Sequence, residues 1–343
     1  MGITGLWQKL KTNGLDPQPT LPSDLADVFY EVDLQGCFFS VIKTMFVDEE
    51  SKPGSAHRVG VRLAYKIKAV FGDARLCVHV DGGSAHEKAY AASKRAKTRT
   101  TDMAKLDKEL DKLQAKSEMG KWTSTTTMNF INRNINKLFV LTPADKEAMR
   151  DGLEASGVSV CLCQTEADVC IARRPDKDVE DGPCRQRIAV SIDSDLLVYE
   201  SISAVLRPMP EHNGYGLYVK SDVLRALDLP SARHMAVYGI VNENDYGRNV
   251  EQLGLARNLD IVRTLPSEGL GEMLETYSRL ASRAIGELVD PHRFHRAHRV
   301  FGSHQQHLIE GRSPTNDTYR SYRQRFEHLK SLRLTRKPDP TTR

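Results

Sequence analysis

The chain has 343 residues, enough to bury a substantial core as one large domain or two smaller ones. Its formal net charge of +4 is only mildly basic, which is compatible with binding to a polyanion but does not require it. No apolar run approaches the length of a membrane span and no signal peptide opens the sequence, so we expect a soluble nuclear or cytoplasmic protein without a membrane partner.

Three short apolar runs rich in β-branched residues predict buried strands at 28–33, 74–81 and 187–192. Acidic residues stand at or just beyond the ends of these runs, namely Asp33, Asp81, Asp193 and Asp195. Ligands of open α/β sheets bind beyond the carboxyl ends of the strands, so these side chains should face a site and not the core. We therefore predict an α/β protein with a mostly parallel sheet and four carboxylates at one edge.

A single Asp after a strand is more often a turn former or an N-cap than a ligand. Several acids at one edge differ, because like charges repel and raise one another's pKa unless cations neutralise them. Carboxylate oxygens without nearby Cys or His ligands favour Mg²⁺ or Mn²⁺ over zinc.

The six cysteines lie mostly in apolar runs and lack the spacing of a zinc site. We expect them to be reduced and buried, with Cys161 and Cys163 at alternate positions of a strand.

Helical and strand patterns alternate along the rest of the chain. Helices are expected at 34–47, 57–71, from Pro143 to about 155, at 221–227 and from about 232, and strands at 158–162 and, at a sheet edge, 205–210 and 216–219. A charged loop is expected between 173 and 186.

The stretch 84–121 holds ten Lys and Arg against six Asp and Glu. Leu106, Leu110 and Leu113 form one helical stripe within it. On composition alone, a solvated helical hairpin is the favoured interpretation. Because this stretch leaves from an acid-bearing strand end, it could also bind phosphates while the acids hold metal.

Glu166 and Asp168 stand at a predicted helix start, where acids are common because of the helix dipole. Side chains two residues apart on a helix point about 200° apart, so both cannot reach one ion directly unless the first lies outside the regular helix. We expect Asp168 to contact metal and Glu166 to act through water.

Five histidines between 292 and 307 are spaced as if for a metal cluster, but the spacing winds around a helix among arginines. A basic helical face is the favoured interpretation over zinc. Residues 319–343 hold eight Lys and Arg against two acids, which predicts a basic, partly disordered tail that could contact nucleic acid.

Taken together, five short motifs resemble those of the flap endonuclease (XPG-like) family of structure-specific 5′ nucleases, which have a PIN-like core. They are Met1-Gly-Ile-Thr-Gly-Leu6, Val80-Asp-Gly82, Glu166-Ala-Asp168, Asp193-Ser-Asp-Leu-Leu197 and Asn244-Asp-Tyr246. The resemblance covers roughly residues 1–260, and the order and spacing of the motifs are more specific than any one of them.

The resemblance implies seven metal-binding carboxylates, which are Asp33, Asp81, Glu166, Asp168, Asp193, Asp195 and Asp245. It also implies two catalytic cations, Lys88 and Arg95, that would polarise the scissile phosphate. Asp168 would bridge two Mg²⁺ (or Mn²⁺) ions, and Glu166 would hold metal-bound water.

The same resemblance makes 84–136 a helical arch over the site. The nucleic-acid contacts that it implies are Gly2, Lys88, Lys94, Arg95, Lys97, Arg99, Gly254 and Arg257. The core would span 1–265, followed by a helical, basic and His-rich part at 266–318 packed on the core and the tail at 319–343.

A helix-turn-helix at about 245–265 departs from the family pattern. Where the family commonly reads Gly-Ile-Gly-Pro-Lys-Arg, this chain reads Gln252-Leu-Gly-Leu-Ala-Arg257, so that only Gly254 and Arg257 match. Whether this helix-turn-helix binds K⁺ and duplex DNA as the family does is therefore left open. No sliding-clamp motif is recognisable.

These features predict a monomeric, metal-dependent nuclease that cleaves flap, branched or 5′-ended DNA in the nucleus. Two alternatives stay open from the sequence: a catalytically silent PIN-like scaffold that binds nucleic acid or protein, and an RNA-directed nuclease with the same metal core. A haloacid-type phosphatase built on Asp193-Ser-Asp195 would instead use a covalent Asp nucleophile.

Overall fold

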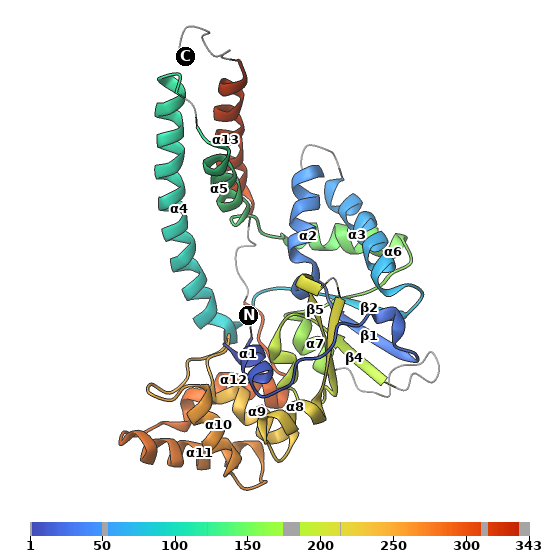
Figure 1. The fold of residues 1–343 in the computed structure, drawn as a ribbon, viewed down its shortest axis with the longest axis vertical. Coiled ribbons are helices and arrows are strands. Elements are labelled where there is room, and N and C mark those ends of the chain that lie inside the picture. The colour runs from blue at the N-terminus through green and yellow to red at the C-terminus, as the bar shows by residue number, and fades with distance from the viewer. Residues whose placement is uncertain are drawn as a thin grey trace. The chain divides into compact units, whose positions relative to one another are not determined.

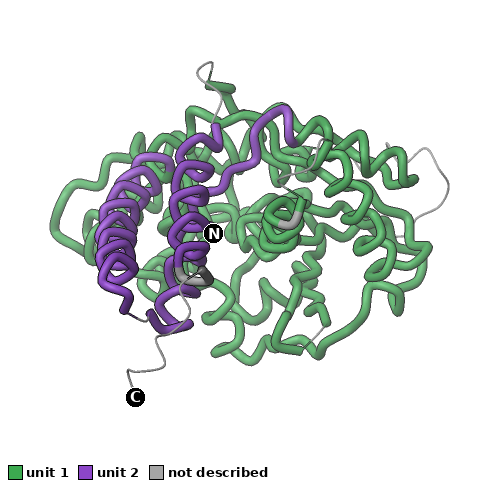
Figure 2. The backbone as a smooth tube through the Cα atoms, turned by 90° about the horizontal axis from the view of Figure 1, so that it is seen from above, with its two compact units in different colours: residues 1–91, 146–310 green, residues 92–145, 311–343 purple. Residues whose placement is uncertain are grey.

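The computed structural model describes residues 2–49, 54–121, 123–173, 186–212, 214–309 and 315–335 (Figure 1). The chain divides into two compact units, each built from two separate segments (Figure 2). Unit 1 comprises Met1–Ala91 and Lys146–Glu310, and unit 2 comprises Ala92–Asp145 and Gly311–Arg343. Most of the expected arch thus groups with the end of the chain. The charged loop expected between 173 and 186 lies almost wholly outside the described residues.

Within the described part of unit 1, six strands form one sheet in the order β3-β2-β1-β4-β5-β6. They are β1 Val28–Asp33, β2 Arg75–Val80, β3 Ser159–Leu162, β4 Gln186–Val190, β5 Ala204–Met209 and β6 Gly214–Val219. All neighbouring strands pair in parallel except β5 and β6. The predicted α/β class with a mostly parallel sheet is confirmed. The prediction that 205–210 forms an edge strand is wrong, because β6 pairs antiparallel with β5 and is itself the outermost strand on that side of the sheet.

The central strands are buried on both faces, and this burial explains why their sequences are mostly apolar. In β1, Tyr30 and Val32 are fully buried on one face while Glu31 and Asp33 are buried on the other. A strand enclosed on both sides cannot show the alternation of a half-exposed strand, so its apolar run is nearly continuous.

Helices cover both faces of this sheet. α2 (Leu34–Glu49) and α3 (Ser55–Phe71) connect β1 to β2, and α7 (Ala167–Arg173) connects β3 to β4. These two crossovers run in opposite directions along the sheet, so right-handed connections place them on opposite faces. α6 (Pro143–Ala155) packs on α3 so closely that a Cβ at Gly60 would lie 2.2 Å from the carbonyl oxygen of Met149.

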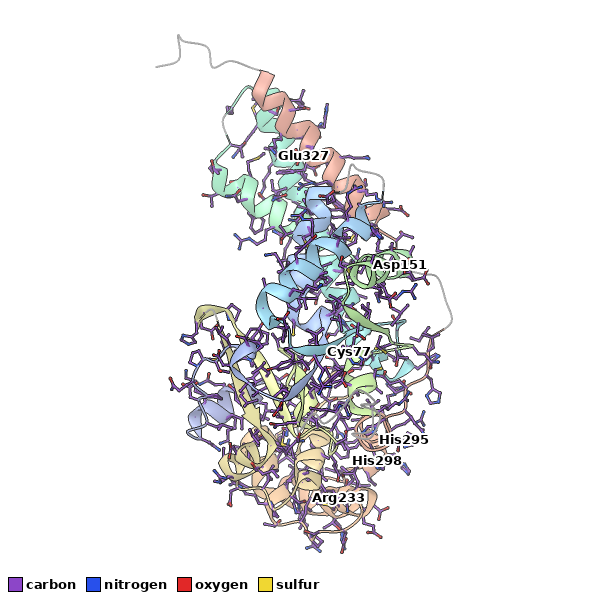
Figure 3. The ribbon with its side chains drawn as sticks, turned by 90° about the vertical axis from the view of Figure 1, so that its right-hand side faces the viewer. Cys77, Asp151, Arg233, His295, His298 and Glu327 are labelled. Carbon is purple, nitrogen blue, oxygen red and sulfur yellow. The ribbon has the colours of Figure 1, made fainter. Side chains whose placement is uncertain are left out.

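The other helices of unit 1 form a layer beside the α7 face with a large buried core. They are α1 Leu6–Thr12, α8 Lys220–Leu227, α9 Ala232–Val241, α10 Leu255–Arg263, α11 Leu270–Ile285 and α12 His295–Ser303. α9 lies at its centre, and every residue of α9 from His234 to Val241 is buried. In Figure 3, His295 and His298 mark this helical layer, apart from Cys77 in the sheet.

Unit 2 contains α4 (Ala89–Glu118) from Ala92 onward, together with α5 (Thr125–Asn136) and α13 (Asp317–Thr335). The predicted stripe of Leu106, Leu110 and Leu113 is buried. Residues 317–335, most of which were expected in a frayed tail, form a helix because Tyr319, Phe326 and Leu329 supply a buried apolar face. Residues 336–343 lie outside the described part. None of the described helices is both long enough and apolar enough to span a membrane.

Gly82 is where β2 meets the turn between β3 and α7. A Cβ on Gly82 would lie 2.0 Å from the carbonyl oxygen of Cys163 and 2.3 Å from that of Gln164. We predict that Gly82→Ala forces the turn away and lowers the free energy of unfolding by about 1–3 kcal/mol in urea denaturation. Gly271→Ala is the control, because its Cβ would meet only His298 at 3.9 Å. Equal stability of the two variants would contradict the close approach.

Candidate active site

Five parallel strands end at one edge of the sheet, and acidic residues of the predicted site follow four of them, β1, β2, β3 and β4. β1 and β4 are neighbours although chain order leads from β1 to β2 on its other side, so ligands are expected at this reversal of strand order. Asp33 ends β1, Asp81 follows β2, and Glu166 and Asp168 flank the start of α7, which follows β3. After β4, Asp193 caps the 3₁₀ turn η3 (Ser194–Leu197), and Asp195 lies in that turn. Asp245 lies in the turn after α9.

Asp33 is tied to two elements at this edge. Its Oδ1 accepts the Gly36 N–H at 2.8 Å, and its Oδ2 accepts the Ser191 hydroxyl at 2.8 Å. Burial, and next the charge of Asp81, raise the pKa of Asp33 to about 7. The hydrogen bonds to its oxygens only partly oppose this shift.

Asp81 connects β2 to the start of α7. Its Oδ1 accepts the Ala167 N–H at 2.7 Å, and its own N–H donates to Gln35 Oε1 at 2.8 Å. Burial raises the pKa of Asp81, and the charge of Glu166 adds to that rise. The strand-end acid and the acids of α7 are therefore held as one group.

Lys88 brings its ammonium among the acids. Its Nζ lies 2.6 Å from Glu166 Oε1 and 3.0 Å from Asp245 Oδ2. Glu166 Oε2 also accepts the Tyr246 hydroxyl at 2.8 Å and Gln306 Nε2 at 2.7 Å. Burial opposes the charge of Lys88, but the surrounding carboxylates outweigh it and hold the pKa of Lys88 well above its ordinary value.

The pKa of Asp168 responds to burial and to the charges of acids that follow different strands. Burial raises the pKa of Asp168 well above its usual range, and the charges of Glu166, Asp193 and Asp81 add to this. Its Oδ2 accepts the Tyr199 hydroxyl at 3.2 Å. Asp168 is thus electrostatically coupled both to the acid after β2 and to the acid after β4.

Asp193 and Asp195 stand close together in one 3₁₀ turn. Asp193 Oδ1 accepts the Asp195 N–H at 3.1 Å. Asp195 is 2% exposed, and its buried Oδ1 meets no hydrogen-bond donor among the described residues. Burial, and then Asp193 and Asp168, raise the pKa of Asp195 well above its usual range. Gly2 borders this turn so tightly that its Cβ would lie 2.2 Å from Asp193 Oδ1.

This donor set fits a hard divalent cation. All seven predicted ligands are carboxylates, and those with raised pKa values disfavour one another's charge. Among the described residues, the buried Oδ1 of Asp195 has no hydrogen-bond donor. Bound Mg²⁺ or Mn²⁺ would neutralise the repelling carboxylates and give the Asp195 oxygen a partner, since these ions prefer oxygen ligands.

The predicted nucleic-acid contacts are distributed over both units. Gly2 and Lys88 border the acids, whereas Lys94, Arg95, Lys97 and Arg99 lie on the part of α4 that belongs to unit 2. Of these four, Arg99 donates to the Leu138 carbonyl at 3.0 Å, within unit 2. Arg95 is exposed, and its role stays a prediction.

The turn before α10 keeps a special backbone shape despite its altered sequence. Gln252 has a φ of +66°, in the left-handed region where the family pattern has glycine. Gly254 caps α10 with open space at its Cβ position, and Arg257 is exposed. The backbone can therefore form this turn, but with a glutamine side chain on it.

Sequence reasoning missed two residues of the site, Tyr199 and Gln306. Tyr199 lies two residues after the fourth motif, so its position was a usable signal. Gln306 comes from a segment 140 residues beyond Glu166, and no local pattern indicates their contact. Of the five histidines, His307 Nδ1 lies 2.7 Å from Glu87 Oε1 and 3.4 Å from Arg299 Nη1, and His295 Nε2 lies 2.6 Å from Arg299 Nη2. The interpretation of this segment as a basic helical face stays a prediction.

Asp195 offers a test of whether the acids at this edge repel one another when no metal is bound. We predict that Asp195→Asn raises the free energy of unfolding by about 1–3 kcal/mol in EDTA, because it removes a buried charge and supplies a donor amide. Asp73→Asn is the control: Asp73 is exposed, and its replacement should change stability by less than about 0.5 kcal/mol. Urea denaturation at neutral pH measures both, and a destabilised Asp195→Asn would contradict the crowding.

No family model and no curated protein matches the sequence. Solved structures do share its fold. Flap endonuclease-1 from Methanococcus jannaschii is 14% identical with a TM-score of 0.50, and the match covers 93% of this chain and 96% of that chain. The catalytic core of Rad2 in complex with a DNA substrate is 13% identical with a TM-score of 0.48, covering 97% and 99%. The bacteriophage T5 D15 flap endonuclease is 12% identical with a TM-score of 0.44, covering 90% and 99%. The likeness to the archaeal structure shows that the chain has the flap endonuclease fold with a PIN-like α/β core, as its motifs predicted.

Proposed function

We propose that this protein is a divalent-metal-dependent, structure-specific 5′ nuclease that hydrolyses phosphodiester bonds near a 5′ end or a junction in DNA. One observation carries the proposal: seven carboxylates from the strand ends and the turn after α9 gather at one edge, with the Lys88 ammonium between Glu166 and Asp245. The shared fold with an archaeal flap endonuclease supports it.

The residues divide naturally into two groups of ligands. Asp33 and Asp81 would hold mainly one ion, and Asp193, Asp195 and Asp245 mainly a second. Besides burial, the charges of Asp193 and Asp81, from the two groups, both raise the pKa of Asp168, and we assign Asp168 as a ligand shared by both ions. When bound, the two ions would activate water for attack and stabilise the leaving oxygen.

Lys88 and Glu166 would act on the reacting groups. Lys88 is held among the acids at the edge where a phosphate would bind, so its ammonium can offset the charge that develops on the phosphate. Glu166 is oriented by Tyr246, Gln306 and Lys88, and we assign to it the role of holding metal-bound water. Arg95 is proposed as the second cation by analogy, and a planar guanidinium suits bidentate contact with phosphate.

Ends and junctions suit this site better than continuous duplex. A nucleotide must leave the base stack to reach ligands at the edge of a sheet, at a cost of a few kcal/mol that is smallest at a free end or a junction. The metal core contacts phosphates and cannot by itself distinguish DNA from RNA. DNA and a nuclear location are the choices that the family resemblance favours.

A silent scaffold is the weaker alternative. Holding several buried, mutually repelling carboxylates together lowers stability, and a protein that only binds has no physical need for it. An equally buried neutral turn would serve a scaffold better.

The central experiment measures cleavage of a 5′-flap DNA, its single strand and an RNA version, with Mg²⁺ or with EDTA. We expect cutting near the junction that requires Mg²⁺ and that Asp168→Ala reduces by about three orders of magnitude or more. Asp73→Ala is the matched control and should retain full activity. Cleavage by Asp168→Ala at a near-normal rate would refute the bridging role, and binding without cleavage of any substrate would favour the scaffold.

Lys88→Ala separates catalysis from binding. Because the ammonium lies among the proposed ligands, we expect it to lower the single-turnover cleavage rate about 10²-fold or more while changing the Kd for flap DNA much less. Fluorescence anisotropy in Ca²⁺ gives the Kd, and quenched-flow cleavage gives the rate. Equal losses in both would make Lys88 a phosphate anchor only.

A further inference from the structure

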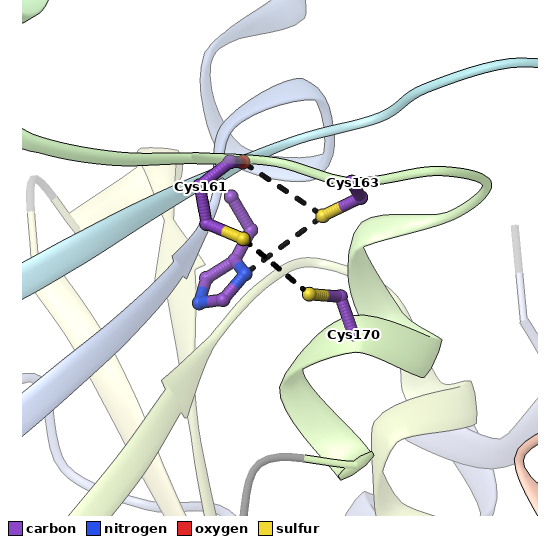
Figure 4. A group of neighbouring side chains, drawn as sticks. Cys161, Cys163 and Cys170 are labelled. Carbon is purple, nitrogen blue, oxygen red and sulfur yellow. Dashed lines mark hydrogen bonds between the residues drawn. The ribbon is translucent and has the colours of Figure 1, made fainter. Parts of the chain in front are cut away.

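Four side chains outside the carboxylate edge converge on one point. The Sγ atoms of Cys161, Cys163 and Cys170 and a ring nitrogen of His79 all lie within 4.8 Å of one another. Cys161 Sγ is 3.6 Å from Cys170 Sγ, and Cys163 Sγ is 3.8 Å from His79 Nδ1 (Figure 4). The proposed nuclease mechanism uses none of these groups.

The fold brings them together through strand register. His79 in β2 pairs directly with Cys161 in the neighbouring strand β3. Cys163 lies two residues after Cys161, and alternate residues of an extended chain share one face. α7 then begins at Ala167 and returns Cys170 to the same face. The expectation of reduced thiols on a strand thus omitted the two partners that come from other elements.

Two of the six distances among the four ligand atoms match a tetrahedral metal site, and all six are within 4.8 Å. Zn–S bonds of about 2.3 Å and Zn–N bonds of about 2.1 Å in a tetrahedron place neighbouring ligand atoms roughly 3.5–3.8 Å apart. The two distances of 3.6 and 3.8 Å fall at this spacing. Three thiolates and one imidazole are also a ligand set of closed, structural zinc sites.

The histidine is prepared for this role by its second nitrogen. His79 Nε2 lies 2.5 Å from Glu31 Oε2, which leaves Nδ1 facing the sulfur atoms. Glu31 is 1% exposed, and its other oxygen accepts Arg187 Nη2 at 2.6 Å. A carboxylate that orients the ring and increases its basicity is the usual partner of a metal-bound histidine.

We propose that His79, Cys161, Cys163 and Cys170 bind one structural Zn²⁺ ion. In the sequence, the three cysteines flank the turn that carries Glu166 and Asp168, so the ion would fasten this turn to β2 at His79, two residues before Asp81. The site is separate in chemistry from the carboxylate edge, because soft thiolate ligands select zinc whereas carboxylates select Mg²⁺ or Mn²⁺. Cys161 and Cys170 are only partly buried, which leaves a path for the ion to enter.

A disulfide between Cys161 and Cys170 is the competing explanation. Their sulfur atoms are 3.6 Å apart, whereas a disulfide bond is about 2.05 Å long. Such a bond would also leave unexplained why Cys163 and the Glu31-oriented His79 face the same point. Zinc accounts for all four groups.

The test measures metal content in the full-length protein, purified from zinc-supplemented cells and passed through gel filtration with mild EDTA. We expect mass spectrometry to find about one zinc ion per chain, because thiolate-bound zinc resists treatment that strips Mg²⁺. Cys161→Ser, Cys163→Ser and Cys170→Ser should each lose the zinc. Cys37→Ser is the matched control, because Cys37 donates to the Val190 carbonyl and lies outside the cluster.

A cobalt experiment keeps the test decisive if the serine variants fail to fold. Wild-type protein refolded with Co²⁺ should show the intense visible bands and thiolate charge-transfer absorption of a tetrahedral sulfur site. Metal-free protein, zinc retained by all three cluster variants, a bound iron–sulfur chromophore, or a Cys161–Cys170 disulfide found by differential alkylation would each overturn the proposal. Metal content is read without substrate, so this result is independent of whether the protein cleaves DNA.

Discussion

Repulsion among carboxylates at one sheet edge is the constraint on which the rest of this structure depends. Parallel pairing from β3 to β4 delivers the ends of four strands to the same place, and acids stand at or beyond each end. Much of the surrounding structure offsets this charge: Ser191 and a backbone N–H hold Asp33, Tyr199 holds Asp168, and Lys88 lies between Glu166 and Asp245. These contacts leave negative charge unbalanced, above all at Asp195, and a divalent cation would neutralise that charge.

The turn between β3 and α7 is held by contacts on two sides. On one side it presents Glu166 and Asp168 to the acidic edge, and on the other it is enclosed by the cysteines of the proposed zinc site. Gly82 lets β2 approach its backbone, and Asp81 accepts a hydrogen bond from the first residue of α7. A turn that carries two mutually repelling acids gains from fastening on both sides, because its own charges favour opening.

The chain leaves unit 1 and returns to it beside the same acids. Lys88 stands just before the departure and contacts Glu166 and Asp245. Lys146 stands at the return, and its Nζ donates to the Gly82 carbonyl at 2.7 Å, next to Asp81. The two cations that flank the segment 92–145 in the sequence therefore both belong to unit 1 and contact residues at its carboxylate edge.

The sequence by itself determined the strands, their acidic ends and Lys88, because burial on both faces, turn chemistry and motif spacing are local properties of the chain. Parallel connectivity then made a single acidic edge the natural outcome. Only the tertiary structure decided that His79 faces Cys161, that Gln306 reaches Glu166, that β6 covers β5, and that residues 317–335 form a helix. Each of these depends on strand register or on packing between distant segments, and a one-dimensional pattern carries no record of which distant residue will lie opposite.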